Sequence, residues 1–180
     1  MGFDPSASAE SGSGIEFFSS YFDPVRDIEK YKPDLLVMRH VLEHLEEPSV
    51  FLEKLAYGSF KLDKPIYFFA ETPCVDVAIK SNRIVDFFYE HPSQFTKSSF
   101  TKLLRTGGEI QCISTDYKEE VVNGIVKLGL PKKSILQIQK AQHFLQNTAQ
   151  NKSQLTSQFN QLTAGTEKIA IWGGTGKAAT

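Results

Sequence analysis

The chain has 180 residues, of which 41% are hydrophobic and 23% are charged, and its formal net charge is −1. This composition is ordinary for a globular domain and excludes a mostly disordered chain. The small net charge lacks the basic excess of nucleic-acid-binding proteins, so we expect no nucleic-acid partner. No apolar stretch reaches the roughly 20 residues of a membrane helix, and the first residues carry no signal pattern. We therefore expect a soluble, cytoplasmic protein without a membrane partner.

The first forty residues predict short strands and few helices. Residues 2–4 have the pattern of a strand end, and Pro5 suits the first turn of a short helix. Residues 15–18 predict a second strand, and residues 27–32 a short connection. The uninterrupted apolar run 35–38 is typical of a strand that is covered on both faces.

The middle of the chain alternates helix and strand patterns. Pro48 begins a predicted helix that ends near Gly58, and residues 66–70 predict a strand followed by Glu71, Thr72 and Pro73. This alternation is typical of α/β proteins with a parallel sheet.

A helix and a hairpin follow. Thr96 or Ser98 can cap a helix that runs to residue 105 and ends at Gly107 and Gly108. Residues 109–115 alternate polar with apolar side chains, and residues 120–126 can pair with them as a hairpin, although the residues between give no strong turn signal.

The last third predicts one long, Gln-rich helix over residues 134–162, and then a new strand over residues 168–172. Gly174, Gly176 and Ala179 have the spacing of a dinucleotide-binding turn, a weak signal by itself. We divide the chain into a main domain (1–130), a helical connector (131–164) and the start of a further Rossmann-like domain (165–180).

Polar side chains stand where chemistry is expected in such a fold. Arg39, His40, Glu43 and His44 follow the apolar strand, and ligands of open α/β sheets bind beyond the carboxyl ends of the strands.

A metal site is not expected from these residues. His40 and His44 with Glu43 have the order HXXEH, which is found in one group of metalloproteases, but the segment follows a strand and does not lie within a long helix. Cys74 and Cys112 lack a CXXC pattern, so we expect two reduced, packed thiols.

Several segments together carry a family resemblance. They are RHVLEHLEEPSVFL from residue 39, AETPCVDVAIKSN from residue 70, FFYEHPSQFTKSSFTKLL from residue 87 and IAIWGGTGKAAT from residue 169. With them the chain resembles the class I S-adenosylmethionine-dependent methyltransferases, in the branch of sugar C-methyltransferases with an added carboxyl-terminal domain. The resemblance covers nearly the whole chain.

The resemblance implies a cofactor site for S-adenosylmethionine. Asp4 would bind the ribose hydroxyls, Tyr21 and Phe22 would flank the adenine, and Arg39 and His40 would border the methionine end. The residues alone leave plainer alternatives, because Asp4 before Pro5 is also a turn signal and the two aromatic rings also suit a core.

The resemblance also implies a catalytic pair. His91 would take a proton from a keto-sugar carbon, a task that suits a neutral imidazole, and Glu90 would support it. The chain departs from the family here, because Phe88 stands where the family has a Tyr and Tyr89 is shifted by one. The plainer alternative is a surface Glu-His-Pro turn.

The chain departs from the family at its start, because no glycine-rich loop precedes Asp4. We therefore expect a partial Rossmann-like α/β sheet without its first strand, as in an interior fragment of a methyltransferase that acts on a nucleotide-linked keto-sugar. The alternatives are a nucleotide- or sugar-binding module without catalysis and an inactive remnant. An open sheet edge favours a homo-oligomer.

Overall fold

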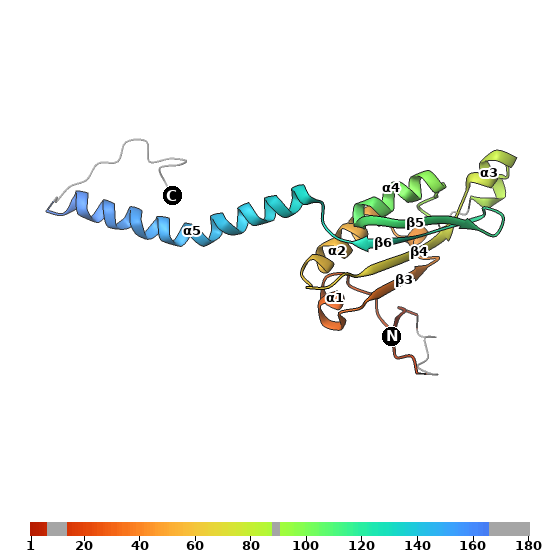
Figure 1. The fold of residues 1–180 in the computed structure, drawn as a ribbon, viewed down its shortest axis with the longest axis horizontal. Coiled ribbons are helices and arrows are strands. Elements are labelled where there is room, and N and C mark those ends of the chain that lie inside the picture. The colour runs from red at the N-terminus through yellow and green to blue at the C-terminus, as the bar shows by residue number, and fades with distance from the viewer. Residues whose placement is uncertain (7–13, 88–90, 166–180) are drawn as a thin grey trace. The chain divides into compact units, whose positions relative to one another are not determined.

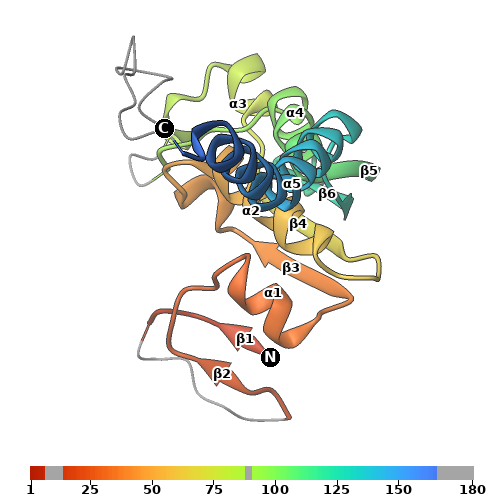
Figure 2. The same ribbon diagram turned by 90° about the vertical axis from the view of Figure 1, so that its left-hand side faces the viewer.

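In the computed structural model, residues 1–6, 14–87 and 91–165 are described, and they form two units, Met1–Pro131 and Lys132–Thr180. Figure 1 shows the elements of the first unit, and Figure 2 shows them after a quarter turn.

A four-stranded mixed sheet is the centre of the first unit. Its strands are β3 (Leu35–Arg39), β4 (Tyr67–Pro73), β5 (Gly108–Asp116) and β6 (Val121–Leu128), in the order β3-β4-β6-β5. Strands β3 and β4 are parallel, whereas β6 is antiparallel to both of its neighbours. The predicted hairpin is therefore confirmed, and the α/β architecture is compatible with a Rossmann-like fold.

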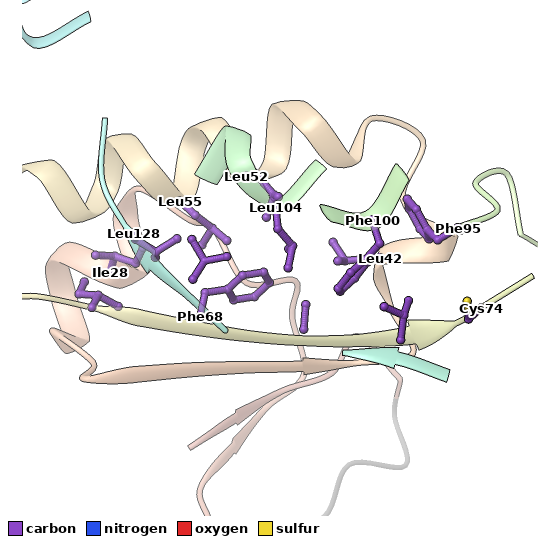
Figure 3. Close-up of a cluster of buried hydrophobic side chains, with 14 residues drawn as sticks. Ile28, Leu42, Leu52, Leu55, Phe68, Cys74, Phe95, Phe100, Leu104 and Leu128 are labelled. Carbon is purple, nitrogen blue, oxygen red and sulfur yellow. The ribbon is translucent and has the colours of Figure 1, made fainter. Parts of the chain in front are cut away.

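Two helices cover one face of this sheet, α2 (Pro48–Phe60) and α4 (Lys97–Gly107) (Figure 1). Figure 3 shows the core between them and β4, where Leu52, Phe68 and Phe100 are at most 2% exposed. Thr96 caps α4 by accepting a hydrogen bond from the Ser99 N–H, and the Ser99 hydroxyl accepts from the Thr96 N–H. The helix begins where the sequence predicts, because this reciprocal cap satisfies two otherwise orphaned donors.

Strand β3 differs from its prediction. Its exposure alternates along the strand, and Leu35 and Val37 are 53% and 60% exposed. Leu36 and Met38 pack against the core from the opposite face. The expectation of a strand covered on both faces is wrong, because an apolar run does not show whether anything covers its second face.

Residues 27–32, predicted as a connection, are largely helical. Helix α1 spans Arg26–Tyr31, and Asp23 Oδ1 accepts hydrogen bonds from the N–H groups of Val25 and Arg26 at its start. A helix of six residues has too few turns for a periodic signal. The prediction was wrong for that reason.

Helix α2 begins at Pro48 as predicted but continues past Gly58 to Phe60. A Cβ atom on Gly58 would lie 2.5 Å from the carbonyl oxygen of Pro24, so this glycine permits close packing against the segment before α1. Its role is steric, and it does not end the helix.

The amino-terminal strands are shorter than predicted. Strands β1 (Gly2–Phe3) and β2 (Phe17–Phe18) form a parallel pair, and Pro5 lies in a bend. The rings of Phe3 and Phe18 stack with centroids 5.0 Å apart.

The remaining elements include three short pieces, η1 (Leu42–His44), α3 (Asp76–Ser81) and η2 (Ile84–Asp86). The predicted long helix is confirmed as α5 (Lys132–Thr163). The predicted strand 168–172 and the glycine turn lie outside the described residues. Among the helices that the structure describes, none has the length and apolarity needed to cross a bilayer.

Candidate functional site

The carboxyl ends of β3 and β4 carry an ion pair. The sheet register sets Arg39 beside Glu71, and Arg39 Nε donates to Glu71 Oε1 at 2.9 Å. Asn123 of β6 is the next residue in the same row. Because side chains alternate along a strand, Glu71 and its neighbour Thr72 point to opposite faces of the sheet.

His40 lies at the end of the sheet, between the face that carries Glu71 and the face that carries Thr72. Its backbone has a φ of 52°, and its N–H donates to the carbonyl oxygen of Glu71 at 2.9 Å. The imidazole Nε2 lies 3.2 Å from Glu71 Oε1, and Nδ1 lies 3.5 Å from Glu43 Oε1. One imidazole therefore contacts a carboxylate on each side of the sheet end.

Glu43 is a buried acid, with only 2% of its surface exposed. Its Oε2 accepts a hydrogen bond of 2.9 Å from the hydroxyl of Thr72, which is fully buried. Its backbone carbonyl accepts from the N–H of Ser93 at 3.3 Å. Glu43 thus ties η1 both to the end of β4 and to the segment that carries His91.

The rings of His44 and His91 meet edge to face, with centroids 4.7 Å apart. Ligand atoms of Glu43, His44 and His91 all lie within 4.8 Å of one another. We call these three residues the histidine cluster. Two segments 47 residues apart are brought together here, as His44 follows β3 and His91 precedes α4. Glu90 lies outside the described residues.

A second feature is an open groove of about 420 Å³ between the start of α1 and the start of α2. Its lining residues are Tyr21, Phe22, Asp23, Pro24, Arg26, Glu47, Val50, Phe51 and Lys54. Tyr21 is 80% exposed, whereas the Phe22 ring packs edge-on against Phe3. The groove offers aromatic surface beside charged side chains of both signs.

Asp4 is exposed at the end of β1 and does not line this groove. Its Oδ1 accepts a hydrogen bond of 2.8 Å from the Ser6 N–H, and this bond lowers the pKa of the Asp4 carboxyl. The turn that the Asp-Pro pair indicates is therefore present.

Sequence reasoning missed two members of the site, Glu71 and Thr72. The signal that singled out Arg39 applies to them as well, because they end β4 beside Arg39. It also described both cysteines as packed thiols, whereas Cys74 is buried and Cys112 is exposed.

Comparisons with known proteins add nothing to this site, since no protein-family model and no curated protein matches the chain.

Proposed function

We propose that the chain belongs to an S-adenosylmethionine-dependent methyltransferase that acts on a carbon of a nucleotide-linked keto-sugar or a related small molecule. The observation that supports this proposal best is the meeting of His44 and His91 beside the buried Glu43 carboxylate. His44 and His91 lie in segments 39–52 and 87–104, which are two of the segments that carry the family resemblance.

The groove suits the adenosine end of the cofactor. Tyr21 and Phe22 offer aromatic faces to a base, and the side chains of Arg26, Glu47 and Lys54 offer hydrogen-bonding groups. Its volume falls within the range of about 300–1,000 Å³ that is usual for small-molecule sites. His44 and Glu47 are three residues apart, so the groove and the histidine cluster share the segment that links β3 to α2.

When bound, the cofactor supplies an activated methyl group on a sulfonium sulfur. The task left to the protein is to align the acceptor and remove a proton from it. The His91 imidazole takes that proton through a ring nitrogen, and the resulting imidazolium lies beside the carboxyl group of Glu43. Thr72 and His40 hold that carboxylate in place.

Two measurements test this proposal. Calorimetry with S-adenosylmethionine should show binding that weakens in Tyr21→Ala, because the aromatic face is lost. Methyl transfer from labelled cofactor to nucleotide-linked keto-sugars should be abolished in His91→Gln, while the affinity for the cofactor stays nearly unchanged. His143→Gln is the matched control, since His143 is an exposed residue of α5.

The outcomes separate the alternatives. Undiminished transfer in His91→Gln removes His91 from the mechanism. Binding of nucleotide-sugars without any transfer favours a binding module, and binding of neither ligand favours an inactive remnant.

We also propose self-association through the exposed face of β3, where Leu35 and Val37 lie open to solvent. The substitution Val37→Lys places a charge on this exposed face. It should lower the molecular mass that light scattering measures for the particles, without lowering the stability of the fold. Monomers of the unmodified chain at every concentration contradict this part of the proposal.

A further inference from the structure

The histidine cluster has the composition of a metal site, because it joins two imidazoles and one carboxylate. We propose that Glu43, His44 and His91 bind one divalent transition-metal ion of the zinc class. The donor atoms come from two distant segments, so no local motif predicts the set. His40, the other histidine of the HXXEH order, is turned towards Glu71 and Glu43.

The charge of Glu43 is the first argument. A buried carboxylate is costly unless a positive charge or several donors compensate it. Glu71 has Arg39 at 2.9 Å, whereas the ion-pair partner of Glu43 among the described residues is the imidazole of His40, at 3.5 Å. That imidazole is charged only when it is protonated. A cation bound beside His44 and His91 would place a positive charge next to this carboxyl group.

The donor types select the class of metal. Imidazole nitrogen suits zinc and its transition-metal neighbours, whereas calcium and magnesium prefer oxygen ligands. Two histidines and one glutamate occur at zinc sites that keep a fourth position open for water or substrate. The Thr72 hydroxyl donates a hydrogen bond to Glu43 Oε2. In metal sites, groups that do not touch the metal commonly hold a ligating carboxylate in this way.

The spacing requires a modest closure. Zinc bonds of about 2.1 Å at tetrahedral angles set donor atoms roughly 3.4 Å apart, whereas the donors here lie within 4.8 Å of one another. The carboxylate is held by its buried surroundings, while His44 is exposed and His91 is half-buried. Closing the site therefore requires the two imidazole rings to move, because the carboxylate is the more firmly held donor.

A bound metal ion changes the chemistry of His91. An imidazole nitrogen that ligates zinc has no lone pair left to take a proton, so metal binding and the proton transfer proposed above exclude each other. The metal proposal stands on the geometry of the cluster. Methyl transfer with His91 as the base is then a property of the metal-free chain.

Binding by the full chain is the test. Calorimetry with Zn²⁺ should show one ion per chain, and Co²⁺ should give the visible absorption of a four-coordinate site. Loss of an outer partner commonly weakens binding by about 10–100-fold, so loss of a ligand in His44→Gln or His91→Gln should weaken it by at least that factor. His143→Gln, remote in sequence and exposed, should bind as the unmodified chain does.

Two results overturn the proposal: absence of Zn²⁺ binding, and binding that His44→Gln and His91→Gln leave unchanged. The second means that the ion sits elsewhere on the surface. His44 is exposed, so its variant should fold, which circular dichroism can verify. Failure of methyl transfer by the metal-free chain, with Zn²⁺ binding intact, would contradict the proposed function and leave the metal site standing.

Discussion

Thr72 donates its hydroxyl hydrogen to Oε2 of Glu43 across 2.9 Å, and neither residue is more than 2% exposed. The bond joins the end of β4 to the turn after β3. It holds in place the one carboxylate that the histidine cluster contains.

We predict that Thr72→Val destabilises the protein by about 1–3 kcal/mol, because the buried carboxylate loses a donor while the shape of the side chain is kept. Urea denaturation followed by circular dichroism measures this change. The control is Thr101→Val, whose exposed hydroxyl bonds the Lys97 carbonyl and whose loss should cost less than about 0.5 kcal/mol. Equal costs for the two variants would contradict a special role of the Thr72 bond.

The buried carboxyl group of Asp27 should make the stability of the folded protein depend on pH. The side chain of Arg26 donates two hydrogen bonds to this buried carboxylate and lowers its pKa. The folded state therefore favours ionised Asp27, whose contribution to stability is complete above the unfolded pKa of about 3.9 and is lost as the pH falls through the lower folded value.

Replacement of Asp27 by Asn should accordingly lower stability at pH 7 and flatten its decline below about pH 4. Urea denaturation at a series of pH values measures both effects. Asp63→Asn, at an exposed position, should keep the slope of the unmodified chain. A slope in Asp27→Asn as steep as that of the unmodified chain would show that other groups control acid unfolding.

The elements with a long periodic pattern were predictable from the sequence. The long helix α5, the capped start of α4 and the β5-β6 hairpin all follow from local patterns and caps. Helix α1 was not predictable, because six residues carry no period and its start depends on Asp23. The exposed face of β3 was not predictable either, since burial depends on what packs there.

The candidate site also has parts that the sequence predicts and parts that it does not. The position of Arg39 and His40 at a strand end follows from the sequence alone. The contact between His44 and His91 does not follow from the sequence. It depends on the hydrogen bond from the Ser93 N–H to the Glu43 carbonyl oxygen and on the isolated β-bridge between Cys74 and Phe95 beside β4. These contacts join segments that are far apart in the chain, and a local pattern does not encode them.

Two helical glycines predict opposite responses to the same substitution. A Cβ atom at Gly58 would meet the Pro24 carbonyl oxygen at 2.5 Å, a backbone atom that cannot turn aside. At Gly107 the nearest atoms, on Leu128 and Leu52, lie at 3.6 Å, which is ordinary contact. Gly58→Ala should therefore destabilise the protein by about 1–3 kcal/mol, as overpacked cores do.

Gly107→Ala should be neutral or stabilising by up to about 1 kcal/mol, because alanine favours the helix and fits the space. Thermal and urea denaturation of both variants measure the contrast. If the Gly58→Ala variant were more stable than the unmodified chain, there would have to be room for a Cβ atom at residue 58. Helix α2 would then lie further from the Pro24 carbonyl oxygen than the distance of 2.5 Å to that Cβ implies. The groove that Pro24 and Phe51 share would then have a different shape, and the adenine-binding role proposed for Tyr21 would lose its support.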